Sequence, residues 1–149
     1  MAVDGKSTGY AGRAPAPLHL WVLGVLLVLW NGLGVALAIA AQTARIPSVD
    51  PQISAYFDNQ PLWFVLLADL GPFAGLAGAV AILLQSRTAM WFFVAQLAIT
   101  GIANAYEVLV GSSLLLTEPE TRSASLVLAA FIATEIAYAW FLSKRRVLY

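Results

Sequence analysis

The chain has 149 residues, of which 60% are hydrophobic and 11% are charged, and its eight basic and eight acidic residues cancel. Soluble domains have roughly 25% charged residues, so this composition indicates a membrane protein, and the lack of a basic stripe argues against a nucleic-acid-binding protein. With no cysteine and one histidine, the chain offers no thiolate metal site and no bis-histidine haem ligation, so we expect neither metal nor cofactor.

Four apolar segments are each long enough to cross a hydrocarbon core of about 30 Å, which takes about 20 helical residues. They cover residues 18–41, 62–84, 89–115 and 124–142. Backbone groups in lipid must be hydrogen-bonded within their own segment, and no strand-like alternation is present, so we expect helices. The sequence therefore predicts an all-α membrane protein with four transmembrane helices in one antiparallel bundle over residues 18–142. A tail, residues 1–17, precedes the bundle, and a short basic tail, residues 143–149, follows it.

The connections between these segments support the count of four. Residues 41–61 are polar and contain several prolines, and Asp50 followed by Pro51 predicts the start of a short helix on the membrane surface. Residues 85–87 form a tight turn, and residues 116–123 form an acidic loop that contains Pro119. "AIAAQ" (38–42) resembles a signal-peptide cleavage site, but the apolar stretch before it is long and contains Asn31, so we expect it to be retained.

The basic residues predict the orientation of the bundle. Six of them lie on one side, namely Lys6, Arg13, Arg87, Lys144, Arg145 and Arg146, whereas Arg45 and Arg122 lie on the other. Because basic residues concentrate in cytoplasmic loops, both termini are expected in the cytoplasm. Four tryptophans near segment ends, Trp21, Trp63, Trp91 and Trp140, are expected to anchor the helices at the membrane interfaces.

Polar residues within the spans predict a pocket. With a rise of 1.5 Å per residue, Asn31, Asp69 and Asn104 each lie about 10 Å below the outer surface, and Glu107 lies above them. Glu135 lies about 17 Å down, near the bilayer centre, where we expect it to form the floor of an outward-facing polar pocket.

Helical angles assign faces to these residues. Gln96, Thr100, Asn104, Glu107 and Gly111 fall within an arc of about 80°, so this polar stripe must face protein or water. Tyr138 lies one turn from Glu135 and is expected to line the same cavity. In the first span, Gly24, Asn31, Gly34 and Ala38 share a face that lets another helix approach closely.

Glycines mark a second packing face, in the second span. Gly71, Gly75 and Gly78 lie nearly opposite Asp69. Small residues of this kind let helices approach closely, so the face serves either packing within one bundle or self-association of two copies.

A carboxylate at the bilayer centre costs about 2.5 to 3.5 kcal/mol, and such residues are functional by default. No intramembrane lysine or arginine is available to pair with Glu135, so a neutral carboxyl that donates a hydrogen bond to Asn31 or Asn104 is expected. Three interpretations stay open for Glu135: helix–helix packing, proton or cation handling, and contact with a partner subunit. Packing is the stronger interpretation for Asp69 and Glu107, which can reach headgroup water.

Four stretches carry a family resemblance: "LWNGLG" (29–34), "FDNQPLW" (57–63), "GLAGAVAILLQSRTAMWFFVAQL" (75–97) and "YAWFLSKRRVL" (138–148). They resemble a family of small four-span bacterial inner-membrane proteins, mostly uncharacterised, of which some carry a sugar-transporter label. The resemblance implies a multi-pass protein of the bacterial inner membrane and raises the expectation of transport. It supplies no catalytic or binding residues.

Two functions from different classes therefore remain. The first is a small-solute or proton-linked transporter, oligomeric because four helices are too few for two repeat bundles, with its pocket at the polar residues above. The alternative is a non-catalytic accessory subunit of a larger membrane complex. An enzyme is not expected, since the sequence contains no nucleophile with a base, metal-ligand cluster or phosphate loop. The lipid bilayer is the one partner that the composition itself predicts.

Overall fold

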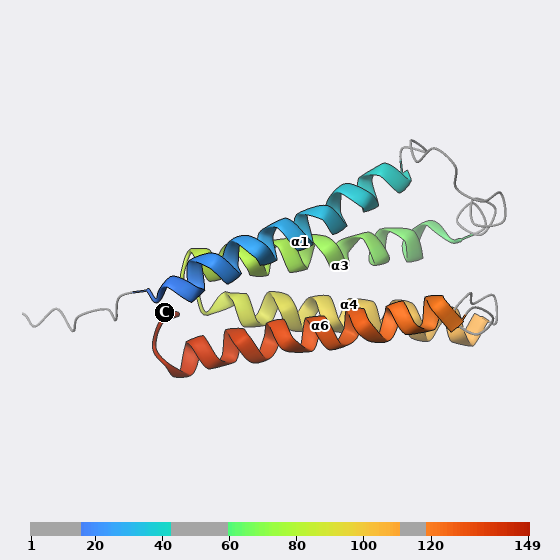
Figure 1. The fold of residues 1–149 in the computed structure, drawn as a ribbon. Helices are drawn as coiled ribbons and strands as arrows, with labels where there is room; N and C mark the ends of the chain where they lie inside the picture. The colour runs from blue at the N-terminus through green and yellow to red at the C-terminus, as the bar shows by residue number, and fades with distance from the viewer. Residues whose placement is uncertain (1–15, 43–59, 111–118) are drawn as a thin grey trace, which may run out of the picture.

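The computed structural model describes residues 16–42, 60–110 and 119–149, and within these ranges the chain forms four helices and no strand. The helices are α1 (Leu18–Gln42), α3 (Leu62–Leu83), α4 (Thr88–Val110) and α6 (Pro119–Lys144). Figure 1 shows them running along one another, with α1 inclined to the rest. Each is long and apolar enough to cross a membrane. The predicted all-α, antiparallel four-helix membrane bundle is therefore confirmed.

The start of α6 differs from the predicted span. α6 begins at Pro119 instead of residue 124, because a proline fits the first helical turn, where its missing N–H is not needed. α4 is described as far as Val110, so the predicted end near residue 115 lies outside the described residues. The short helix predicted after Asp50 also lies outside them.

The helices pack in chain order. We call the end of the bundle at residues 84–87, where α3 turns into α4, the turn end, and the opposite end the loop end. Backbone contacts are concentrated in the α1–α3, α3–α4 and α4–α6 pairs, whereas α1 and α6 approach each other less closely. The side of the bundle between α1 and α6 is therefore the most open.

Glycines bring α1 and α3 together. A β-carbon at Gly24 would lie 2.4 Å from Leu83 Cδ2, and one at Gly34 would lie 3.5 Å from Pro72 Cβ. Membrane helices use small residues in this way to bring their backbones close. The predicted close-packing face of the first span is confirmed.

The α3 glycines are buried and face α4. A β-carbon at Gly71 would lie 3.6 Å from Ile99 Cγ2, and one at Gly78 would lie 2.8 Å from the Phe93 ring. This glycine face therefore packs within one bundle, which was one of the two alternatives left by the sequence.

The apolar core is concentrated toward the turn end. Its buried members are Leu20, Ala79, Ala81, Ile82, Ala89, Phe93, Ala139, Leu142, Val147 and Leu148. Toward the loop end the described helices are held by a smaller aromatic cluster, in which the Phe64 and Tyr106 ring centroids are 4.7 Å apart and those of Trp63 and Tyr106 are 4.8 Å apart. The bundle is thus most closely packed at its turn end.

The C-terminal residues fold back into this core. Arg146 adopts a positive φ of 56°, and the Val147 N–H donates a 3.0 Å hydrogen bond to the Leu142 carbonyl, the pattern of a Schellman helix end. The Tyr149 N–H donates a 2.8 Å hydrogen bond to the Gln85 carbonyl. The segment predicted as a basic tail therefore has exposed charges but also two buried residues, Val147 and Leu148.

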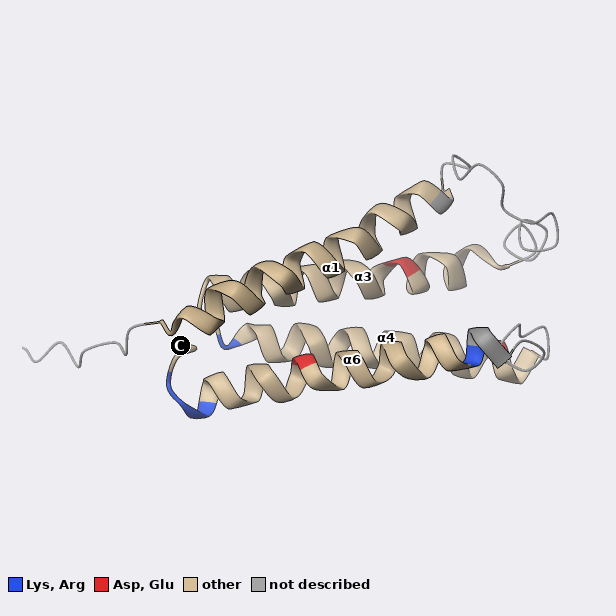
Figure 2. Ribbon diagram, in the orientation of Figure 1, with Lys and Arg blue, Asp and Glu red and all other residues tan. Residues whose placement is uncertain are grey.

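Apolar side chains cover the outer surface of the helices, as a membrane protein requires. Leu18 and Leu109 are 78% and 84% exposed, which suits contact with lipid tails. The four tryptophans predicted as interface anchors are exposed and lie near helix ends. Among the described residues, lysines and arginines lie near helix ends, whereas acidic residues also occur within the helices (Figure 2).

Candidate functional site

Three polar side chains from three helices meet inside the bundle. Asn31 of α1, Gln96 of α4 and Glu135 of α6 are 3%, 6% and 2% exposed. The Asn31 amide Nδ2 donates a 2.8 Å hydrogen bond to Glu135 Oε1, and Gln96 Nε2 donates a 3.2 Å hydrogen bond to Asn31 Oδ1. We call these residues the polar triad.

The remaining helix, α3, contributes a glycine to this site. A β-carbon at Gly75 of α3 would lie 2.0 Å from Asn31 Oδ1 and 2.6 Å from the terminal atoms of Gln96. Only glycine leaves this space free, because every other residue type carries a β-carbon. Gly75 is therefore required for the triad to form.

Two buried oxygen atoms of the triad, Gln96 Oε1 and Glu135 Oε2, have no hydrogen-bond partner among the described residues. α1, α3 and α4 contain no lysine or arginine, and those of α6, Arg122 and Lys144, lie near its ends. An ionised Glu135 is therefore an unpaired charge in an apolar interior, which is costly. The expected hydrogen bond from Glu135 to Asn31 or Asn104 is corrected: Glu135 Oε1 instead accepts from Asn31, and Asn104 bonds Ser125. The arrangement suits a neutral carboxyl, and ionisation needs a compensating cation or water.

The predicted depths of Asn31 and Glu135 differ by about 7 Å along the helix axis, yet the two side chains are in hydrogen-bond contact. Side chains lean toward the N-terminus of their helix. α1 starts at the turn end and α6 at the loop end, so Asn31 and Glu135 lean toward each other. The early start of α6 also shifts its level relative to the predicted span.

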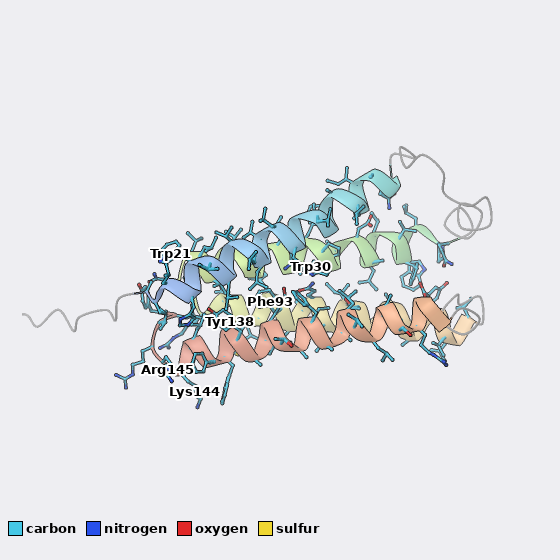
Figure 3. The ribbon with its side chains drawn as sticks, in the orientation of Figure 1. Trp21, Trp30, Phe93, Tyr138, Lys144 and Arg145 are labelled. Carbon is cyan, nitrogen blue, oxygen red and sulfur yellow. The ribbon has the colours of Figure 1, made fainter. Side chains whose placement is uncertain are left out.

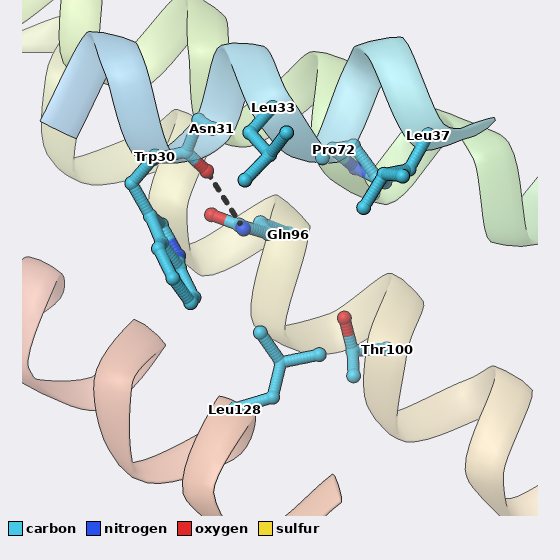
Figure 4. Close-up of a pocket in the computed structure, with 10 residues that line it drawn as sticks. Trp30, Asn31, Leu33, Leu37, Pro72, Gln96, Thr100 and Leu128 are labelled. Carbon is cyan, nitrogen blue, oxygen red and sulfur yellow. Dashed lines mark hydrogen bonds between the residues drawn. The ribbon is translucent and has the colours of Figure 1, made fainter. Parts of the chain in front are cut away.

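A cavity of about 190 Å³ adjoins the triad on its loop-end side (Figure 4). It is lined by Trp30, Asn31, Leu33, Gly34, Leu37, Gly71, Pro72, Gln96, Thr100 and Leu128. Asn31 and Gln96 present their amides to it, and the remaining wall is largely apolar. A cavity is thus found on the side where the sequence predicts a pocket, but Glu135 is not among its lining residues.

Asp69 and Asn104 do not line the cavity beside Asn31, so their predicted place in one pocket with it is corrected. Asp69 Oδ2 accepts a 2.7 Å hydrogen bond from Gln42 Nε2, because the glycine face opposite Asp69 occupies the interior. Asn104 Nδ2 donates a 2.8 Å hydrogen bond to Ser125 Oγ on α6. Glu107 is half-buried near the end of the described part of α4.

Three described members of the polar stripe of α4 face other helices or the cavity, in line with the prediction that the stripe faces protein or water. Gln96 contacts α1 and Asn104 contacts α6. Thr100 lines the cavity, and its Oγ1 would lie 3.7 Å from a β-carbon at Gly71 of α3. Gly111, the last member of the stripe, lies outside the described residues.

Sequence reasoning missed a second hollow, a groove between α1 and α6 with a volume of about 440 Å³. Its walls are formed by Leu23, Leu26, Leu27, Trp30, Phe131, Thr134, Glu135 and Tyr138. Tyr138 and Glu135 line one hollow, as predicted, but it is this groove and not the cavity that Asn31, Gln96 and Thr100 line. Trp30 packs on Phe131 with ring centroids 5.0 Å apart, and Figure 3 shows it between the helices. Trp30 lies in the middle of its span, whereas the other four tryptophans lie near span ends. This difference in the sequence could have indicated the groove.

The chain matches no family model, no curated protein and no solved structure.

Proposed function

We propose that this integral membrane protein is a proton-linked transporter of a small solute, with Glu135 as the group that takes up and releases the proton. The observation that carries the proposal is the position of the polar triad between two hollows. Asn31 and Gln96 line the cavity toward the loop end, and Glu135 lines the groove between α1 and α6. A change at the carboxyl therefore reaches both hollows through one hydrogen bond.

The chemistry of the triad supports proton coupling. A neutral Glu135 is compatible with the apolar interior, and an ionised one must be compensated by a bound cation or by water. Asn31 bonds the carboxyl and Gln96 at once, so loss of the proton at Glu135 alters the hydrogen-bonding of the amides that face the cavity. Solute binding and protonation are then linked through a shared network.

The proposal includes more than one copy of the chain and a defined orientation. Four helices are few for alternating access within one chain, so at least two copies are expected. Arg87, Lys144, Arg145 and Arg146 lie at the turn end, whereas Arg122 lies near the loop end, which supports a cytoplasmic turn end and an outward-facing cavity. The resemblance noted above adds the bacterial inner membrane as the expected location.

The test is proton movement in proteoliposomes that contain a trapped pH indicator, with sugars, amino acids and organic cations added one class at a time. Wild-type protein is expected to move protons with at least one class, and Glu135→Gln is expected to abolish that movement. Asp69→Asn is the matched control, because this carboxyl bonds Gln42 outside the triad.

The accessory-subunit alternative predicts a different result. Proteoliposomes with the wild-type protein would then move no more protons than protein-free liposomes, whichever class of solute is added. The protein would also co-purify stoichiometrically with a larger complex. That pair of results would reject the transporter proposal.

A further inference from the structure

The groove between α1 and α6 opens on the lipid-facing side of the bundle. The backbones of these helices approach less closely than those of the other neighbouring pairs, and the α1 wall includes side chains that are well exposed, Leu26 at 55% and Trp30 at 50%. Its volume of about 440 Å³ lies within the roughly 300–1,000 Å³ of ligand sites. A molecule dissolved in the membrane can therefore enter from the side.

The walls of this groove are apolar and aromatic. Three leucines of α1 face Phe131 and Tyr138 of α6, and Trp30 packs on Phe131. Faces of tryptophan, tyrosine and phenylalanine attract cations as well as apolar groups. This lining suits a ligand that is both lipophilic and positively charged.

One acidic side chain lies in the same groove. Glu135 is 2% exposed, and its Oε2 has no hydrogen-bond partner among the described residues. The other titratable side chains nearby are Tyr138 and His19, whose ring centroids are 6.2 Å apart. From α4, the neutral side chain of Gln96 reaches Glu135 only through Asn31, to which it donates a hydrogen bond. The carboxylate of Asp69 on α3 is hydrogen-bonded to Gln42 instead. No described cationic side chain therefore compensates the charge of an ionised Glu135.

We propose that the groove binds a lipophilic organic cation from the membrane, with the ligand charge paired to Glu135 and its apolar groups packed against Leu23, Leu26 and Trp30. The protein releases one proton from Glu135 for each cation bound, so charge balances and no other reactant is needed. This inference rests on the proposed function, since it names the substrate class exchanged for the proton. A lipid acyl chain fills the same volume but carries no charge for Glu135, so it is the weaker candidate.

The test is equilibrium dialysis of tetraphenylphosphonium against the full-length protein in mild detergent, over a range of pH. Because a proton is a product of binding, the apparent affinity should rise by about tenfold per pH unit while Glu135 is protonated in the free protein. Tetraphenylborate has the same shape and the opposite charge, and it should not show this rise. Asp69→Asn should bind like wild type.

Two variants locate the site. Glu135→Gln keeps the shape of the side chain and should remove the pH dependence and weaken binding by at least about tenfold. Leu26→Trp should narrow the groove and weaken binding without a change at the carboxyl. Each variant is first shown to elute as the wild-type protein does in size-exclusion chromatography.

Absence of tetraphenylphosphonium binding at every pH, or equal binding of the cation and the anion, would overturn the inference. Equal binding would instead indicate a lipid-docking surface. If binding fails but another solute drives Glu135-dependent proton movement, the proposed function stands without this substrate class. If binding succeeds but no solute, including this cation, moves protons, the site stands and the transporter proposal fails.

Discussion

The Asn31 amide donates a 2.8 Å hydrogen bond to the Glu135 carboxyl across 104 residues of sequence, and this bond joins α1 to α6. The backbones of these helices make few close contacts, so the bond is one of the main links across the open side of the bundle. It also connects the cavity that Asn31 lines with the groove that Glu135 lines. Its strength therefore affects both packing and function.

Replacing Asn31 with leucine is expected to lower the free energy of unfolding by about 1 to 3 kcal/mol, because Gln96 Nε2 and Glu135 Oε1 both lose their partner. The double variant Asn31→Leu with Glu135→Leu should be more stable than the sum of the single effects predicts, with a coupling of about 0.6 to 1.7 kcal/mol. The free energies of unfolding of the two single variants and the double variant are measured in detergent. Strict additivity would show that the bond contributes nothing.

Gly75→Ala is expected to destabilise the bundle and displace the triad, since its β-carbon would lie 2.0 Å from Asn31 Oδ1. Gly32→Ala is the matched control on α1, because a β-carbon there meets nothing within 4 Å. Alanine favours a helix over glycine by roughly 1 kcal/mol in soluble hosts, so the control should be neutral or more stable. Thermal unfolding compares the two, and equal midpoints would contradict the packing described here.

The C-terminal segment offers a further test of packing. Leu148 is fully buried, so Leu148→Ser is expected to reduce stability by about 2 to 5 kcal/mol, as for other large-to-small core changes. Arg146→Gly should retain stability or raise it by up to about 1 kcal/mol, because φ at this position is 56° and glycine adopts it freely. A tolerated Leu148→Ser with a damaging Arg146→Gly would refute this account of the segment.

The orientation is checked by topology reporters fused after Asp50, Ser86, Pro119 and Tyr149. The distribution of basic residues predicts periplasmic signals at Asp50 and Pro119 and cytoplasmic signals at Ser86 and Tyr149. A periplasmic signal at Tyr149 would show that the orientation is inverted, and the cavity would then face the cytoplasm.

Hydrophobic length was sufficient to predict the four helices, because crossing a membrane imposes both a minimum length and an apolar composition. Small residues also identified the packing faces correctly, as Gly34 against Pro72 illustrates. The boundary of α6 was less predictable, since the residues after Pro119 are polar but helical.

The site was predicted only in part. The burial of Asn31, Gln96 and Glu135 follows from the cost of exposing amides and carboxyls to lipid. Their meeting depends on the lean of each side chain and on the space left by Gly75, neither of which enters an estimate of depth from residue count. Asp69 was misplaced because the glycines opposite it, not the carboxylate, face the interior.

Glu135 as a buried, proton-exchanging carboxyl is the central claim, and a lipophilic carbodiimide tests it directly. The protonated carboxyl adds its O–H across one C=N bond of the reagent, and the adduct rearranges to a stable N-acylurea that mass spectrometry assigns to a residue. We predict modification of Glu135 near neutral pH that falls as the pH rises and the proton is lost. Asp69 and Glu107 should react far less, because both are more exposed than Glu135. Modification of Asp69 and Glu107 with none at Glu135, or modification of Glu135 that does not change with pH, would contradict the account.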